Sequence, residues 1–164
     1  YWIGNQLLDT VEVRQLYDNL LERFGKQLQG RTRELVLGKA PAGARPHHSF
    51  HVLDVHSRVG ELEHSLHTLD SCRISWGHVV AAEGAELLIE RQPLLLRDGK
   101  LVLGDAQRVR MVRQVDGRGF TDAAQVDDWV SLHWGWVCEV LTPEQQVNIE
   151  RYTRHHLALA NQTL

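Results

Sequence analysis

The stretch DDWVSLHWGWVCEVL, from Asp127 to Leu141, is the most informative part of the sequence for the fold. Its side chains alternate in character, as expected for a β-strand, in which neighbouring residues point to opposite faces. One face carries the smaller or polar set Trp129, Ser131, His133 and Gly135. The other carries the bulky set Val130, Leu132, Trp134, Trp136 and Cys138. We therefore predict one strand whose bulky face, Cys138 included, lies in the core, while His133 points away from it.

Several more strands are predicted between Cys72 and this stretch. The segments CRISWGHVVAA, ELLIERQPLLL, KLVLG and QRVRMVRQV alternate or run apolar, and Gly84, Asp98-Gly99 and Asp116-Gly117 separate them with turns. Regular short strands of this kind indicate a small twisted or closed β-barrel. Thr142 and Gln145 form a capping box around a proline at the first helical position, which predicts a helix at the C-terminus.

The first part of the chain has a different character. Residues 1 to about 36 show helical spacing of leucines, and the Gly/Pro/Ala-rich stretch from Gly38 to Pro46 reads as a linker. A histidine-rich connector follows, in which HSFHVLDVH is compatible with a short strand. The predicted class is α+β, with N-terminal helices and linker at 1–45, the connector at 46–70, and a β-barrel with a C-terminal helix at 71–164.

Composition excludes several classes of function. A net charge of −3 without a basic run gives no reason to expect nucleic acid, and charged residues interrupt every apolar segment before it reaches membrane-spanning length. Two cysteines do not make a disulfide scaffold and suit the reducing cytoplasm. No signal peptide is visible, although the start at Tyr1 without a methionine leaves room for an upstream segment. No phosphate loop, nucleophile elbow, HExxH or catalytic carboxylate pair is present, so we expect no independent catalyst.

Cys72 and His133 form the first candidate site. A thiolate and an imidazole are good ligands for iron, zinc or copper. Cys72 opens the first predicted strand and His133 lies in the last, and these two strands can be neighbours in a closed barrel. The alternative is that Cys72 is a small buried hydrophobe and His133 a hydrogen-bonded surface residue.

Ten histidines are the one unusual feature of the composition. A possible second metal site lies in the connector, where four histidines are close in sequence: His47, His48, His51 and His56. A solvated cluster is the favoured interpretation, and a metal-dependent enzyme built on these residues is a further reading. His156 falls on the apolar stripe of the C-terminal helix and is expected to be a packed side chain.

Two motifs give a family resemblance over a little more than half of the chain. From Asp70 to the C-terminus the sequence resembles the hydrogenase assembly chaperones of the HypC/HupF type. SCRISWGHVV places Cys72 and Gly77 at that family's cysteine and glycine, with Trp76 where the family has proline. DDWVSLHWGWVCEVLTPEQQ follows its second motif in order, with matches at Asp128, Trp129, His133 and Gly135. The YWIGN start also resembles an uncharacterised bacterial group encoded near nickel–iron hydrogenase genes.

The resemblance implies an OB-like barrel and a specific role. It implies that Cys72 and His133 hold an iron carrying cyanide and carbon monoxide, passed between a maturation scaffold protein and the hydrogenase large-subunit precursor. Within the two motifs we expect partner contacts at Trp76, Gly77, Trp134 and Gly135. Most of the tryptophans Trp76, Trp129, Trp134 and Trp136 are expected in the core, and any exposed one would anchor an interface.

Two functional hypotheses follow. The first is a carrier or chaperone in nickel–iron hydrogenase maturation, with the iron–cyanide–carbonyl unit as cargo. The second is a protein-binding accessory or scaffold module without metal transfer, and so without a cofactor. An accessible Cys72 within ligand reach of His133 would favour the first. A buried Cys72, with His133 hydrogen-bonded to backbone, would favour the second.

Overall fold

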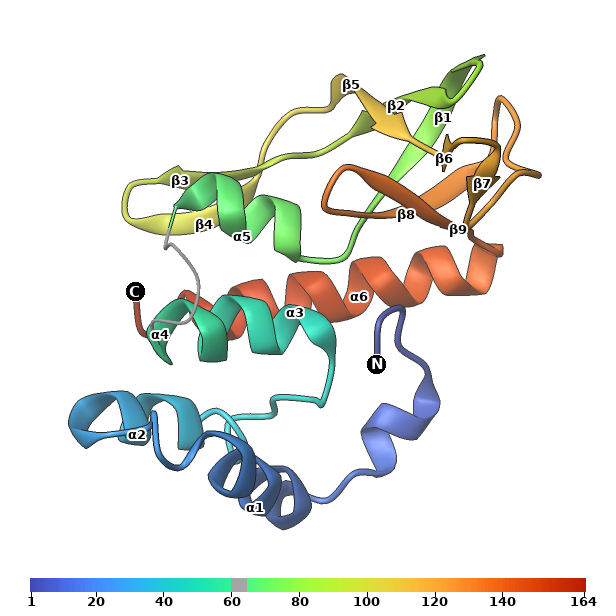
Figure 1. Cartoon of the computed structure of the whole chain (residues 1–164). Coiled ribbons are helices and arrows are strands. Elements are labelled where there is room, and N and C mark those ends of the chain that lie inside the picture. Colours follow the sequence, from blue (N-terminus) through green and yellow to red (C-terminus); the bar gives the residue numbers. More distant parts are fainter. Residues whose placement is uncertain (60–64) are drawn as a thin grey trace.

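The computed structural model of the protein describes residues 1–59 and 65–164 (Figure 1). Residues 60–64, the part of the predicted connector that includes His64, lie outside the described residues. The helices are η1 (Gln6–Thr10), α1 (Val13–Phe24), α2 (Gly30–Leu37), α3 (His48–Phe50), η2 (His51–His56), α4 (Ser57–Val59), α5 (Leu66–Cys72) and α6 (Pro143–Ala160). The strands are β1 (Ser75–Glu83), β2 (Glu86–Arg91), β3 (Leu94–Arg97), β4 (Lys100–Leu103), β5 (Gln107–Val112), β6 (Gln114–Val115), β7 (Arg118–Gly119), β8 (Trp129–His133) and β9 (Trp136–Val140). The predicted α+β class is confirmed.

Five strands form the barrel, in the order β1-β2-β5-β9-β8. Neighbouring strands are antiparallel except at the seam between β5 and β9, where one parallel pair, Val112 with Trp136, completes the ring. The interior is apolar and is filled by Val79, Leu87, Ile89, Met111, Val130, Leu132 and Val137. The predicted segment ELLIERQPLLL divides into β2, which is part of the barrel, and β3. β3 pairs with β4, the predicted segment KLVLG, as a separate hairpin outside the barrel.

The segment from Asp127 to Leu141 is a hairpin, so the prediction of one continuous strand was wrong. The chain turns at Trp134 and Gly135, whose φ angles of 49° and 80° are left-handed, and β8 then pairs with β9. The reversal moves Val137 into the barrel and leaves Cys138 half-buried outside it. The prediction that Cys138 is a core residue was therefore also wrong.

The α6 helix joins the barrel to the helical part of the molecule. Thr142 and Gln145 cap its start reciprocally, as the sequence predicts, through bonds of 2.8 and 3.2 Å. The barrel lies on one side of α6, and α1 and α2 lie on the other (Figure 1). Ile149 packs against Trp76 and Ile74 beneath the barrel, whereas the far end of α6 contacts a helical core of Leu16, Leu20, Phe24, Leu28, Val36, Leu37, Phe50, Val55 and Leu159.

The histidine-rich connector is helical where the structure describes it, which corrects the prediction of a short strand. His48–Val59 runs as α3, the π-helical η2 and α4 without interruption. The His47 side chain accepts a hydrogen bond from the backbone of Ser49 and so caps the first turn. The side chains from His48 to Val55 are buried, and those of His56, Ser57 and Arg58 are half-buried. The alternating sequence suggested a strand. A helix is recognised in a sequence by a polar face that recurs about every 3.6 residues, and the buried part of this helix has no such face.

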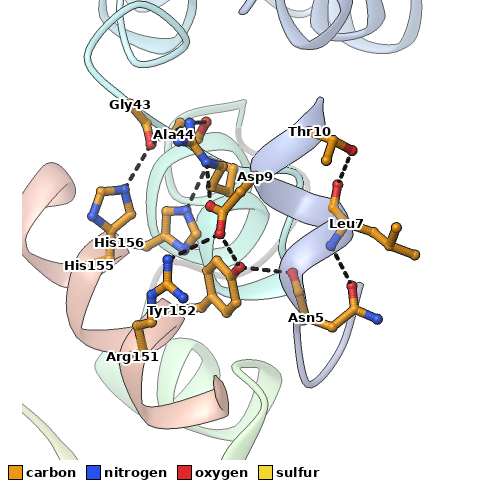
Figure 2. A network of polar contacts seen from close by, with 11 residues as sticks. Asn5, Leu7, Asp9, Thr10, Gly43, Ala44, Arg151, Tyr152, His155 and His156 are labelled. Carbon is orange, nitrogen blue, oxygen red and sulfur yellow. Dashed lines mark hydrogen bonds and ion pairs between the residues drawn. The ribbon is translucent and has the colours of Figure 1, made fainter. Parts of the chain in front are cut away.

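A polar network ties the N-terminal segment to α6 (Figure 2). The Tyr152 hydroxyl donates to the Asn5 carbonyl at 2.9 Å, and the Asp9 carboxylate accepts from Arg45 and Arg151 at 3.0 and 3.1 Å. Asp9 is exposed, and these arginines hold its pKa below the usual range. The network holds the start of the chain at α6, where Trp2 contacts His133 of β8 and Ile3 packs with Ile74 and Trp76.

Candidate metal centre

Cys72 and His133 meet because two elements end side by side. Cys72 is the last residue of α5, rather than the first of a strand, and β1 begins three positions later. His133 is the last residue of β8, which pairs antiparallel with β1 from Ser75 opposite Leu132. The Trp134 amide also donates to the Ser71 carbonyl at 2.9 Å, which fastens the β8–β9 turn to the end of α5.

His48 joins the pair from the helical layer. Its Nε2 donates to the Cys72 carbonyl at 2.8 Å, and its Nδ1 lies 3.2 Å from the Tyr1 hydroxyl. One potential ligand atom each from His48, Cys72 and His133 lie within 4.8 Å of one another. This is the one trio of possible metal ligands that comes together within residues 1–59 and 65–164.

Burial sets the protonation state of the three side chains. It lowers the pKa of His48 to about 4 and also lowers the pKa of His133, so both rings are neutral near pH 7. Burial raises the pKa of the Cys72 thiol, against a hydrogen bond from the Trp134 side chain that lowers it. Cys72 is only 8% exposed. Neutral imidazoles are ready to bind a metal, whereas the thiol must lose its proton on binding.

The donor set fits a transition metal. One sulfur and two imidazole nitrogens suit zinc, copper or low-spin iron. His133 Nε2 is buried and has no hydrogen-bond partner among the described residues, which leaves it available to an ion. The three potential ligand atoms now lie within 4.8 Å of one another. Metal–nitrogen and metal–sulfur bonds of about 2.0–2.3 Å would bring these atoms closer together. His48 could bind the metal ion through Nδ1, which requires the Tyr1 hydroxyl to move away. It could also bind through Nε2, which requires the ring proton to move from Nε2 to Nδ1 and the bond to the Cys72 carbonyl to break.

The first two residues cover this trio, which the sequence did not reveal. The Trp2 ring lies 4.1 Å from the His48 ring and 4.8 Å from the His133 ring, measured between centroids. The Tyr1 hydroxyl also lies 3.1 Å from His51 Nδ1. An aromatic pair at the start of a chain has no sequence signature of a site cover, because its position depends on contacts made far along the chain.

Two pockets flank His133 and Trp134. The first, of about 310 Å³, lies at the mouth of the barrel and includes the charged residues Asp70 and Arg91. The second, of about 340 Å³, is largely aromatic and is lined by Trp2, Phe120, Trp134 and Trp136 together with Cys138. His133 therefore borders both cavities, one with charged residues in its lining and one that is largely aromatic.

No three of the four connector histidines, all of which the structure describes, bring their ligand atoms together. The structure assigns His48 to the trio. His47 instead joins a buried relay in which Ser49 Oγ lies 2.7 Å from His47 Nδ1 and 2.9 Å from His156 Nδ1. His47, His48 and His51 are buried, so the prediction of a solvated cluster was wrong for these three. Helical packing, rather than a loop, removes them from water. The predicted burial of His156 is confirmed.

The four predicted partner residues fall into two groups. Trp76 and Gly77 are buried within β1, and a side chain at Gly77 would clash with Ile89. Trp134 and Gly135 form the exposed turn between β8 and β9. Of the four barrel tryptophans only Trp76 is buried, so the expectation that most lie in the core was wrong.

Comparisons with known proteins place the chain but do not assign a function. In the described part of the chain, no helix has the length and apolar character needed to cross a membrane. No curated protein and no solved structure matches the chain. A family described as "Family of unknown function (DUF6390)" matches residues 1–164, and the chain therefore belongs to that family.

Proposed function

We propose that this protein is a carrier or chaperone in nickel–iron hydrogenase maturation that binds an iron–cyanide–carbonyl unit through Cys72 and His133. The observation that carries the proposal is the convergence of these two side chains with His48, within 4.8 Å of one another. The resemblance to the HypC/HupF chaperones concerns the same two residues. The proposal assigns the protein no catalytic step, and it places the protein in the cytoplasm.

The chemistry of the trio suits a transient cargo. Thiolate and imidazole ligands favour a ferrous iron whose other positions are filled by strong-field ligands. Few protein ligands hold a metal less permanently than a full four-residue site, which suits a protein that must release what it carries. The pockets on either side of His133 provide space beside the ligands for the diatomic groups of the cargo.

The aromatic pocket supports docking on a protein partner. Trp2, Phe120 and Trp134 are exposed around it, and exposed aromatic side chains are enriched where proteins bind one another. We propose that the maturation scaffold or the large-subunit precursor binds at this surface, so that the partner lies against the trio when cargo passes.

A second candidate function is a docking module without metal transfer. Two observations favour it: Cys72 is 8% exposed, and hydrogen bonds to the Cys72 backbone act on both the His48 and the His133 rings. In this reading the trio is a structural junction between α5, β8 and α3, and only the aromatic surface is functional.

Anaerobic co-purification with the scaffold and the large subunit separates the two functions. Infrared spectra in the cyanide and carbonyl stretching region would be compared for wild type, Cys72→Ala and His133→Ala. His155→Ala serves as the matched control, because His155 is exposed and lies outside both the trio and the two pockets beside His133.

We expect bands in wild type and in the His155→Ala control, and their loss in either trio variant. Partner binding without bands, unaffected by the trio variants, would leave the docking module. The absence of both bands and partners would reject the hydrogenase role.

A further inference from the structure

The pocket of about 310 Å³ at the mouth of the barrel is a second place where a ligand could bind, because charged residues take part in its mixed lining. Its walls come from the end of α5, the end of β2 and the β8–β9 turn. Residues from these three elements include Asp70, Ser71, Arg91, His133 and Trp134. The pocket therefore reaches from a buried charged group to one of the candidate metal ligands.

One carboxylate in this region serves two arginines. Asp70 Oδ1 accepts from Arg73 Nε and from the Leu94 amide, each at 2.9 Å, and Asp70 Oδ2 accepts from Arg91 Nη2. Arg73 also donates through Nη2 to the Gln92 carbonyl at 2.7 Å. These bonds use both oxygens of the carboxylate and engage Arg73 on two sides.

The group has an excess of positive charge in a region of low exposure. Arg73 is 1% exposed and Arg91 is 9% exposed, so two guanidinium groups share a single negative charge away from bulk water. A buried charge without a full counter-charge is costly, and a bound anion would remove that cost.

Arg91 is the guanidinium that can meet such an anion. It lines the pocket, whereas Arg73 does not. Among the described residues, the side-chain hydrogen bond of Arg91 uses Nη2, which leaves Nε and Nη1 for a ligand. The other arginine of this pocket, Arg110, is already paired with Glu83 and Glu86 on the outer face of the barrel.

We propose that this pocket binds a small monoanion against Arg91. The anion site stands on the Asp70–Arg73–Arg91 group alone. A second part rests on the proposed function: because His133 lines the same pocket, the anion can also be a ligand of an ion held by the trio. A guanidinium beside a metal-bound anion would stabilise the anion through charge-assisted hydrogen bonds.

Azide is a suitable probe, because it is a small monoanion and also a metal ligand. Two-dimensional nitrogen–proton NMR of the protein without added metal would follow the Arg91 Nε–H and the Gly135 amide during an azide titration at constant ionic strength. We expect saturable shifts in wild type and in Arg91→Lys, and at least a tenfold weaker affinity in Arg91→Met. Arg91→Met should still fold, because it leaves Asp70 and Arg73 as a balanced pair.

Arg108→Met is the matched control, because Arg108 is exposed on β5 and pairs with Glu90 outside the pocket. It should bind azide as wild type does. Shifts that do not saturate, or an equal affinity in Arg91→Met, would overturn the anion site.

The second part has its own test. The antisymmetric stretch of azide in the infrared would be recorded with the protein loaded with cobalt(II). A cobalt-dependent azide band that disappears in His133→Ala supports the bridging role. Azide binding at Arg91 without any cobalt binding at the trio would overturn the bridge and count against the proposed function, while the anion site would stand.

Discussion

The π-helix η2 and the mouth of the barrel each place one carboxylate between two cationic side chains. The two regions differ in how the remaining positive charge is balanced. In η2, Asp54 is fully buried with Lys39 Nζ at 3.4 Å and Arg58 Nη2 at 3.8 Å. At the mouth, Asp70 holds its two arginines through direct hydrogen bonds and faces a pocket.

The end of α6 explains the difference. Lys39 also donates to the Leu159 carbonyl, and Arg58 donates to Thr163 Oγ1 at 2.8 Å. The C-terminal end of a helix carries partial negative charge, so α6 supplies much of the negative charge that Asp54 alone does not. No helix of comparable length ends at Asp70 among the described residues. The comparison shows that an excess of buried positive charge indicates a bound anion only where no other part of the protein supplies the missing negative charge.

Acid should have the largest effect, and it should act on the helical side. Burial lowers the pKa of His47 to about 3 and of His48 and His51 to about 4, and holds His156 well below 6.5. The unfolded chain binds protons at these sites below about pH 6.5, and the folded chain does not, so stability is complete above that pH and falls as pH decreases towards 4. The raised pKa of Asp54 acts in the opposite direction, but it is one group against four.

Each buried histidine should contribute on the order of 2–3 kcal/mol across this window. Urea unfolding between pH 8 and pH 4.5 would measure it. The exposed His155, changed to glutamine, should leave the curve unchanged. A stability that stays level down to pH 5 would contradict the burial of these rings.

Removing the carboxylate of η2 should have the next largest effect. Asp54→Asn leaves the buried Lys39 without its counter-charge and should lower the free energy of unfolding by about 3–5 kcal/mol. The double variant Asp54→Leu with Lys39→Met should lose much less, because it removes the charges together. Denaturant unfolding of the three proteins tests this, and equal losses in single and double variants would show that the pair is not coupled.

Asp70→Asn applies the same change at the mouth, where the loss should be smaller and should respond to anions. About 2 kcal/mol is expected, since Asp70 is partly exposed. Azide at constant ionic strength should recover part of the thermal stability of this variant. It should not do so for Asp54→Asn, because position 54 is fully buried. Equal recovery in both variants would remove the distinction between the two sites.

The smallest effect is expected at the β8–β9 turn. Trp134 has a left-handed φ of 49°, a conformation that bulky residues rarely adopt, and Gly135 follows it. Asparagine before glycine favours such a turn, so Trp134→Asn should raise the free energy of unfolding by about 1 kcal/mol. Asp116→Asn, in a turn of the same kind before Gly117, should be neutral. Thermal unfolding of both variants tests this, and a clear loss in Trp134→Asn would mean that its contacts outweigh the strain.

Local chemical signals in the sequence predicted much of the barrel side. Asp98-Gly99 and Asp116-Gly117 form left-handed turns as expected, and the capping box at Thr142 starts α6. The turn at Trp134 and Gly135 was missed for two reasons. Tryptophan is not a typical turn residue, and bulky residues still stand at every second position across the turn, so the sequence looks like one strand. The sequence also predicted that Cys72 and His133 can lie close together, and their potential ligand atoms lie within 4.8 Å of each other in the structure.

The third member of the trio and its cover lay beyond sequence reasoning. His48 lies in the buried part of a helical run, where no polar face marks the helical spacing in the sequence. The positions of Tyr1 and Trp2 depend on a polar network with α6. Contacts between segments far apart in sequence leave no local pattern. The pairing of Asp70 with two arginines is of the same kind, since Arg91 is 21 positions away.

The spacing of the trio along the chain has a consequence for folding. His48 and Cys72 are 24 positions apart, and Cys72 and His133 lie on either side of nearly the whole barrel. An ion bound by all three would close two loops at once, as a pair of crosslinks does, and would restrict the unfolded chain by an amount on the order of 3 kcal/mol for each loop. Loading and unloading of such a site would then change the resistance of the whole molecule to unfolding, so that proteases would distinguish the ion-bound form from the empty form.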